Sequence, residues 1–188
     1  MKICIDPGLS GPFEPGACAG GVIEAVVNMK IGKLVGDLLF MLGYEVIFTR
    51  RGDIETDDLE FRARLANDEG ADLFVSIHCN SAESATANGV EIYHYPDSEK
   101  GRLLASAIEG VLPKYSALKD RGVGEADFAV LRLTNMTAVL VECGFLSSKE
   151  DREILTDESK QSVIAMGIAA GINRYVINSI TDTFEYQN

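Results

Sequence analysis

The sequence predicts an α/β fold: a three-layer sandwich in which a mostly parallel, twisted sheet is covered by helices on both faces. Short, almost entirely apolar segments alternate along the chain with segments whose apolar residues recur at helical spacing. Strands that form continuous apolar runs are typical of parallel strands buried on both faces. With 188 residues and 46% hydrophobic content, the chain is long enough for one sizeable core. We therefore expect a single domain.

Three strands and two helices are expected in the first half of the chain. The first strand, KICID, ends at a Pro-Gly turn signal. The longest apolar pattern with helical spacing ends at Gly43, a residue type that commonly follows a helix. Asp57, with Glu60 three residues later, resembles a capping box that opens a second helix, which Gly70 closes. The expected strands are 2–6, 44–49 and 71–78, and the expected helices are 22–42 and 57–70.

The second half is expected to alternate in the same way. The segment AVLVECGF is apolar except for one glutamate near its end, which indicates a buried strand. We assign residues 1–178 to one domain and expect residues 179–188 to form a loose C-terminal tail. The expected strands are 89–95 and 138–145, and the expected helices are 97–112 and 159–176.

The charge balance excludes several classes of partner. The chain has 29 acidic and 17 basic residues, a formal net charge of -12, and its Lys and Arg residues form no basic stripe. Nucleic acid and anionic membrane surfaces are therefore poor candidate partners. The opening residues MKICIDPGLS contain no apolar run long enough for a secretory signal, and we expect no membrane span and a monomer. The four cysteines form no CxxC pair, which favours free thiols.

Polar side chains are expected to gather at one edge of the sheet. Asp6 ends the first strand, His78 ends the strand SIH, and Glu142 lies near the end of VLVE. Glu24, in the first turn of the helix after the first strand, points to the same edge. Each residue alone is explained by a helix cap or a solvated strand end. Together, one histidine and several carboxylates at the carboxyl edge of a parallel sheet have the composition of a catalytic zinc site.

Nine sequence blocks in order resemble a known family. The blocks are DPGLSGPFEPGA, Glu24, TRRGD, FRARLAN, ADLFVSIHCNS, GVEIY, DRGVG, FAVLR and AVLVECGFLSSKED. They are similar to the zinc-dependent N-acetylmuramoyl-L-alanine amidases, which hydrolyse peptidoglycan, and the resemblance runs over roughly residues 2 to 176. It implies zinc as cofactor, with Glu24 and His78 as two of three metal ligands and Glu142 as the catalytic carboxylate. The third ligand of the family is a histidine, and Leu9 stands at its position.

Leucine cannot bind zinc, so the sequence leaves three readings of this site open. Glu14 or Cys18 from the same loop could replace the missing ligand, or oxygens of the substrate could complete the shell. In the third reading catalysis is lost or weakened and the domain only binds muropeptide. His94, the one other imidazole, lies inside an expected strand and is interpreted as structural. Strand alternation places His78 and its neighbour Cys79 on opposite faces, which argues against a thiol–histidine pair.

The resemblance also implies a mechanism and a substrate. A bound zinc ion would activate water, and Glu142 would accept a proton from that water and return it to the leaving nitrogen of L-alanine. Arg121, Arg132 and Asn80 are candidate contacts to peptidoglycan or muropeptide. We expect a chain of this kind to be made in the cytoplasm and to act on the cell wall, as a secreted amidase, as one whose signal was trimmed from this sequence, or as a phage endolysin.

Overall fold

A computed structural model describes residues 1–53, 58–84 and 86–185 of the chain. Six strands form its main sheet, in the order β4-β1-β5-β8-β6-β7. The first four run parallel to one another, and β6 and β7 run parallel to each other but antiparallel to β8. The mostly parallel sheet predicted from the sequence is confirmed. The strands are β1 (Lys2–Pro7), β4 (Glu45–Phe48), β5 (Leu73–Asn80), β6 (Val90–His94), β7 (Asp120–Glu125) and β8 (Thr137–Phe145).

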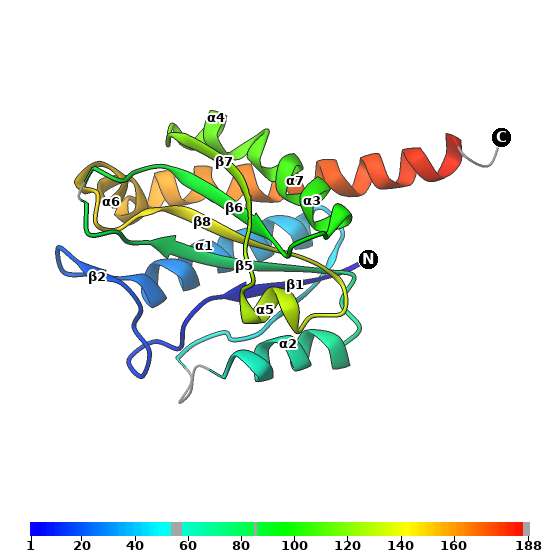
Figure 1. Ribbon diagram of the computed structural model, residues 1–188, viewed down its shortest axis with the longest axis horizontal. Coiled ribbons are helices and arrows are strands. Elements are labelled where there is room, and N and C mark those ends of the chain that lie inside the picture. The colour runs from blue at the N-terminus through cyan, green and yellow to red at the C-terminus, as the bar shows by residue number, and fades with distance from the viewer. Residues whose placement is uncertain (54–57, 85, 186–188) are drawn as a thin grey trace.

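Helices cover both faces of this sheet, as predicted (Figure 1). The larger core lies between the sheet and four helices: α1 (Glu24–Met41), α3 (Glu99–Glu109), α4 (Leu112–Ser116) and α7 (Glu158–Glu185). The smaller core lies on the other face, under α2 (Leu59–Asp68) and α5 (Ala129–Arg132). Helix α6 (Lys149–Thr156) follows β8 and packs against it and α7. The predicted three-layer sandwich is therefore confirmed.

Alternation along β5 explains why both faces are apolar. Its odd-numbered residues from Leu73 to Cys79 pack in the larger core, whereas Phe74 packs in the smaller one. Because neighbouring residues of a strand point to opposite faces, a strand buried on both faces is apolar at most of its positions. His78 thus faces the side of α2 and α5, and the prediction that it points away from Cys79 is confirmed.

Several boundaries and small elements differ from the sequence prediction. The hairpin of β2 (Cys18–Ala19) and β3 (Val22–Ile23) was not predicted, nor were strand β7 and helices α5 and α6. Strand β7 escaped prediction because its sequence, DRGVGE, is polar and glycine-rich, as is common at a sheet edge. Helix α2 begins at Leu59 and is capped by Asp58, whose side chain accepts a hydrogen bond from the Phe61 amide. The predicted cap, Asp57, lies outside the described residues.

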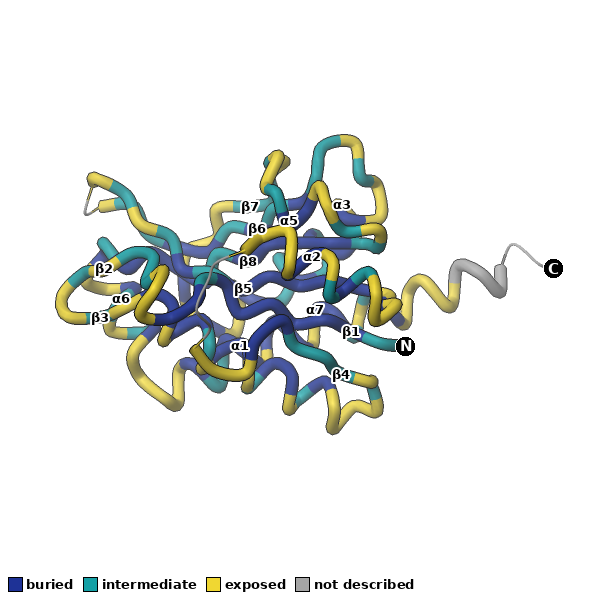
Figure 2. The backbone as a smooth tube through the Cα atoms, turned by 90° about the horizontal axis from the view of Figure 1, so that it is seen from below, coloured by how far each residue is buried: buried dark blue, intermediate teal, exposed yellow. Residues whose placement is uncertain are grey.

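Helix α7 is longer than predicted. It continues to Glu185, so the expectation of a loose tail is wrong for residues 179–185. Figure 2 shows exposed turns of this helix extending beyond the buried body of the molecule, ahead of the part drawn in grey. By length and composition this is the one helix among the described residues that could cross a membrane. Of its most apolar 18-residue stretch, 44% is buried inside the domain. Those buried residues pack against α1, α3 and α4, which is the environment of a core helix.

Candidate active site

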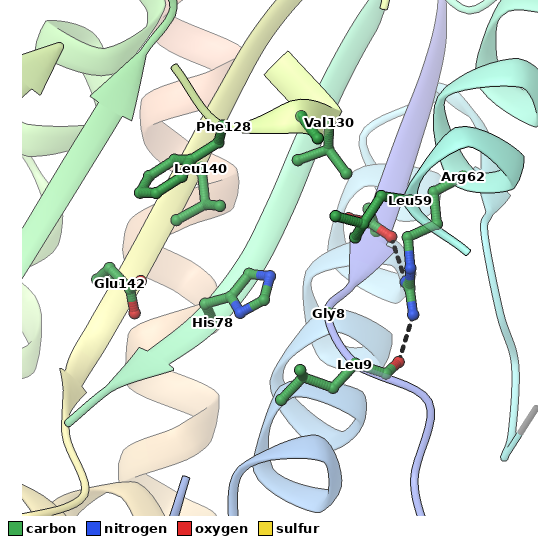
Figure 3. A pocket seen from close by; sticks show the side chains of 11 residues that line it. Gly8, Leu9, Leu59, Arg62, His78, Phe128, Val130, Leu140 and Glu142 are labelled. Carbon is green, nitrogen blue, oxygen red and sulfur yellow. Dashed lines mark hydrogen bonds and ion pairs between the residues drawn. The ribbon is translucent and has the colours of Figure 1, made fainter. Parts of the chain in front are cut away.

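A row of polar side chains crosses the carboxyl end of the sheet. In the register of the strands, His78 of β5 is paired with Glu142 of β8, and Glu142 is paired with Glu91 of β6. Laterally paired residues point to the same face, so these three side chains are neighbours. His78 and Glu142 border a cavity of about 190 Å³ that opens beside α2 and α5 (Figure 3). The cavity is lined by Asp6, Gly8, Leu9, Leu59, Arg62, His78, Phe128, Ala129, Val130, Leu140 and Glu142.

Glu24 and His78 contact each other directly. Helix α1 begins at Glu24, two residues after the predicted start, and Oε1 of this residue lies 3.0 Å from Nδ1 of His78. The same oxygen accepts hydrogen bonds from the Asn28 side chain at 3.2 Å and the Cys79 amide at 3.2 Å, and Oε2 accepts one from the Ala17 amide at 2.9 Å. The Glu24 carboxylate is therefore held on both oxygens.

The pKa values of this pair move in opposite directions. Burial by itself raises the pKa of Glu24, but hydrogen bonds and the charge of His78 lower it overall. Burial by itself lowers the pKa of His78, but the hydrogen bond with Glu24 and the nearby carboxylates raise it overall. The two side chains thus stabilise each other as an ion pair.

Glu142 is the carboxyl group in the cavity whose burial is not offset by hydrogen bonds to both of its oxygens. Its Oε2 is buried and, within the described part of the chain, has no hydrogen-bond partner. Burial raises the pKa of Glu142 to about 7, and the negative charges of Glu24 and Glu91 add to this, whereas the charge of His78 opposes it. A carboxyl group with a pKa near 7 can both accept and donate a proton at neutral pH.

Asp6 lies at the predicted edge but serves a structural purpose. It is fully buried, and Oδ1 accepts hydrogen bonds from Arg62 at 2.6 Å and Thr49 at 2.5 Å, while Oδ2 accepts one from Ser76 at 2.6 Å. Burial by itself raises the pKa of Asp6, but the charge of Arg62 and these hydrogen bonds lower it overall. Of the four polar residues predicted at this edge, Asp6 is therefore the one whose charge is neutralised by an arginine.

Two buried arginines hold the loop that follows Asp6. The Arg62 guanidinium donates to the carbonyl oxygens of Pro7 and Leu9. The Arg50 guanidinium donates to the carbonyl oxygens of Pro7 at 2.7 Å and Gly8 at 2.9 Å. We call Arg50 and Arg62 the arginine clamp. Three successive carbonyl groups are bound by it, which fixes the backbone of residues 7–9 independently of their side chains.

All three predicted substrate contacts already have partners, and two of them, Asn80 and Arg121, lie next to this row. Asn80 donates to Glu91 Oε2 at 3.0 Å, and Arg121 donates to Glu91 Oε1 at 2.7 Å while its guanidinium lies over the Phe145 ring. Arg132 is paired with Asp127 on the surface. Sequence reasoning missed Glu91, although GVEIY was among the blocks noted. Its place beside Glu142 depends on the antiparallel pairing of β6 with β8, which the sequence did not reveal.

The remaining candidates from the sequence are not part of the site. His94 is buried, and its Nδ1 contacts the carbonyl oxygen of Tyr95. All four cysteines are free thiols, as predicted, and Cys79 and Cys143 are buried. Burial raises the pKa of Cys79 and Cys143 far above the ordinary value, so neither thiol is a nucleophile at neutral pH.

The donor set of this cleft does not fit a catalytic zinc ion. Such an ion uses three protein ligands and keeps a fourth position for water. Over the described residues, no group of three His, Cys, Asp or Glu side chains is placed to hold a metal ion. Glu24 and His78 are suitable donors, but they are only two and bind each other. Glu14 and Cys18, the predicted replacements, are exposed side chains, and Cys18 contacts the Gly16 carbonyl oxygen instead.

Gly8 leaves the space that the His78 ring occupies. A Cβ atom on Gly8 would lie 2.1 Å from His78 Nε2, far inside contact distance. We expect Gly8→Ala to displace the ring from Glu24 and to lower the free energy of unfolding by about 1–3 kcal/mol, the usual cost of overpacking. Urea denaturation measures this. Gly52→Ala is the matched control, because a Cβ there meets nothing within 4 Å. Equal stability of both variants would contradict the prediction.

Comparisons with known proteins identify relatives of this chain. A family model described as N-acetylmuramoyl-L-alanine amidase matches residues 3–174. The chain is 37% identical to the uncharacterized protein YqiI of Bacillus subtilis, covering 92% of this chain and 84% of that protein. It is 31% identical to the probable cell wall amidase LytH of Staphylococcus saprophyticus, covering 92% of this chain but only 57% of that protein. The crystal structure of an N-acetylmuramoyl-L-alanine amidase from Clostridium difficile 630 is similar, with a TM-score of 0.89, 33% identity, and coverage of 93% and 96%.

Proposed function

Because the chain belongs to the family of N-acetylmuramoyl-L-alanine amidases, we propose that its cleft binds peptidoglycan at the amide bond between N-acetylmuramic acid and L-alanine. Glu142 is the general base for hydrolysis of that bond. The observation that carries this proposal is the buried Glu142 carboxyl group, which borders the cavity and has a pKa raised to about 7. The site of action is the cell wall, the location that the name of the relative LytH also gives for that protein.

The chemistry of Glu142 follows from its pKa. As a base, its carboxylate accepts a proton from the water that attacks the amide carbonyl carbon. As an acid, it returns this proton to the nitrogen of L-alanine when the carbon–nitrogen bond breaks. The family is generally zinc-dependent, but the two donors of this chain do not make a complete zinc site, so no step is assigned to a metal here.

The apolar side of the cavity suits the groups next to that bond. The lactyl group of N-acetylmuramic acid and the alanine residue each carry a methyl group beside the scissile amide. Leu59, Phe128, Val130 and Leu140 offer apolar surface on this side of the cavity (Figure 3). Burying methyl groups against such surface is favourable by about 0.8 kcal/mol for each CH₂-sized group. Asn80, Arg121 and Arg132 remain predictions as contacts to the peptide stem.

A chemical end-group assay tests the proposed function. Purified peptidoglycan incubated with the protein should gain new amino-terminal L-alanine, because hydrolysis of the amide releases that amine. Labelling of free amines, followed by acid hydrolysis and identification of the labelled amino acid, measures it. Release of a different amino acid, or of new reducing sugar ends, would assign the cut to another bond. No new end from the native chain and no binding to peptidoglycan would contradict the proposal.

A second candidate function is supported by one residue. Leu9 contributes no donor where the family uses histidine, so the domain can bind peptidoglycan with little or no hydrolysis. Sedimentation with insoluble peptidoglycan separates the two functions, since a binding domain co-sediments but releases no amine. Co-sedimentation without release supports this second function, and release supports the first.

A further inference from the structure

Leu9 has an unfavourable backbone conformation. Its φ angle is +66°, in the left-handed region that residues other than glycine seldom adopt. Asparagine, aspartate and histidine are several times more common there than other non-glycine residues. A leucine gains nothing from this conformation, so the cause must lie elsewhere in the structure.

The arginine clamp accounts for the conformation. Arg62 binds the carbonyl oxygen of Leu9 itself, and Arg50 binds that of Gly8, which also accepts a hydrogen bond from the Asn28 side chain. Arg50 and Arg62 are both buried. The loop is therefore held in one shape by groups that do not depend on the side chain at position 9.

This shape directs the Leu9 side chain to the Glu24–His78 pair. The ideal Cβ position of Gly16 lies 2.0 Å from Leu9 Cδ1 and 2.5 Å from Glu24 Oε2. Since both atoms are so close to one point, the leucine methyl group is in contact range of the carboxylate. Figure 3 shows the side chain extending toward the His78 side of the cleft. The leucine side chain therefore lies beside the Glu24 carboxylate and lines the same cavity as His78.

We propose that the native cleft does not retain zinc, because Leu9 occupies the third ligand position of a site whose backbone is already formed, and Glu24 and His78 pair with each other instead. Leu9 is then the single obstacle to a complete site. The inference rests on the proposed function, since it concerns the same cleft, but its main readout is metal binding and does not require activity.

Zinc titration of four purified, metal-stripped proteins tests this proposal. They are the native chain, Leu9→His, Leu9→Asn and native Cys18→Ser, each titrated in competition with a chromophoric chelator. Leu9→Asn is the matched control, because asparagine also tolerates a positive φ but offers a neutral amide instead of an imidazole. Loss of groups that merely support a zinc ligand costs about 10- to 100-fold in affinity. We therefore expect Leu9→His to bind one zinc ion at least that much more tightly than the native chain and Leu9→Asn, with Cys18→Ser equal to native.

Two results would overturn the proposal. Tight, stoichiometric zinc in the native chain would mean that another donor completes the site, and its loss in Cys18→Ser would identify that donor. Failure of Leu9→His to gain affinity while it remains folded would mean that the loop does not present position 9 to the pair. Co-sedimentation of the same proteins with peptidoglycan, measured without zinc, distinguishes a failure of this inference about zinc from a failure of the proposed function. If binding to peptidoglycan persists, only the inference about zinc has failed.

Discussion

Replacing Glu142 by glutamine should reduce amide hydrolysis by about 10²- to 10⁴-fold, the usual contribution of a positioned general base. Glutamine keeps the size of the side chain but cannot exchange a proton with water or the leaving amine. Release of amino-terminal L-alanine from peptidoglycan measures the rate, in the native chain and in Leu9→His. Glu150→Gln, an exposed site on α6, is the matched control. Unchanged hydrolysis by Glu142→Gln in both backgrounds would remove Glu142 from the mechanism.

The same substitution should make the protein more stable at alkaline pH. The pKa of Glu142 is raised from 4.5 to about 7 by burial, so the folded state resists ionisation more than the unfolded state does. For a group raised in this way, the stabilisation is complete below the unfolded pKa and is lost as the pH rises through 7. At 1.36 kcal/mol per pKa unit, the native chain loses about 3 kcal/mol across that range, and Glu142→Gln does not.

Urea denaturation of both proteins at pH 5.5 and 8.5 measures this difference. The unfolding free energy of Glu142→Gln relative to the native chain should increase between the two pH values. A gain in stability together with a loss of hydrolysis would show that the variant is folded and that the effect on rate is chemical. A relative stability that does not change with pH would contradict the raised pKa.

Arg62→Met should lower the free energy of unfolding by about 3–5 kcal/mol, the typical cost of removing one partner from a buried ion pair. The Asp6–Arg62 pair is almost completely buried, with side chains about 1% exposed. Removing the guanidinium leaves the buried Asp6 carboxylate without an opposite charge and leaves the carbonyl oxygens of Pro7 and Leu9 without this donor. Because the clamp holds the loop, we also expect Arg62→Met to weaken zinc binding in the Leu9→His protein.

Arg64→Met on the same helix is the matched control for this prediction. Arg64 is exposed and lies near the Phe61 ring, so its loss should change stability little. The pKa of Asp6 is lowered in the folded state, so its pairing stabilises the protein above the ordinary pKa of 3.8 and this stabilisation is lost as the pH falls through the folded value. The destabilisation by Arg62→Met should therefore shrink in acid. Equal stability of the two variants at neutral pH would refute a structural role for the pair.

The sequence identified the main residues of the cleft but not all of its geometry. Glu24, His78 and Glu142 were recognisable because the carboxyl ends of parallel strands share one edge, so polar residues that follow apolar runs converge there. Asp6 met the same criterion, but its structural role was not visible in the sequence, since only packing brings Arg62, Thr49 and Ser76 around it. Glu91 was missed as a neighbour of Glu142, because the reversed direction of β6 leaves no sign in local periodicity.

The amino-acid sequence by itself determined the layered α/β fold, the absence of a histidine at position 9 and the identity of the acidic and imidazole groups at the sheet edge. These follow from local composition and spacing, which do not depend on how the helices and strands are arranged in space. Tertiary structure decided which carboxyl group is neutralised by an arginine and which is left buried without compensation, and it directed Leu9 at the Glu24–His78 pair. Such properties depend on distances between residues far apart in the chain, because charge interactions and desolvation are set by the packed neighbours of a group and not by its neighbours in sequence.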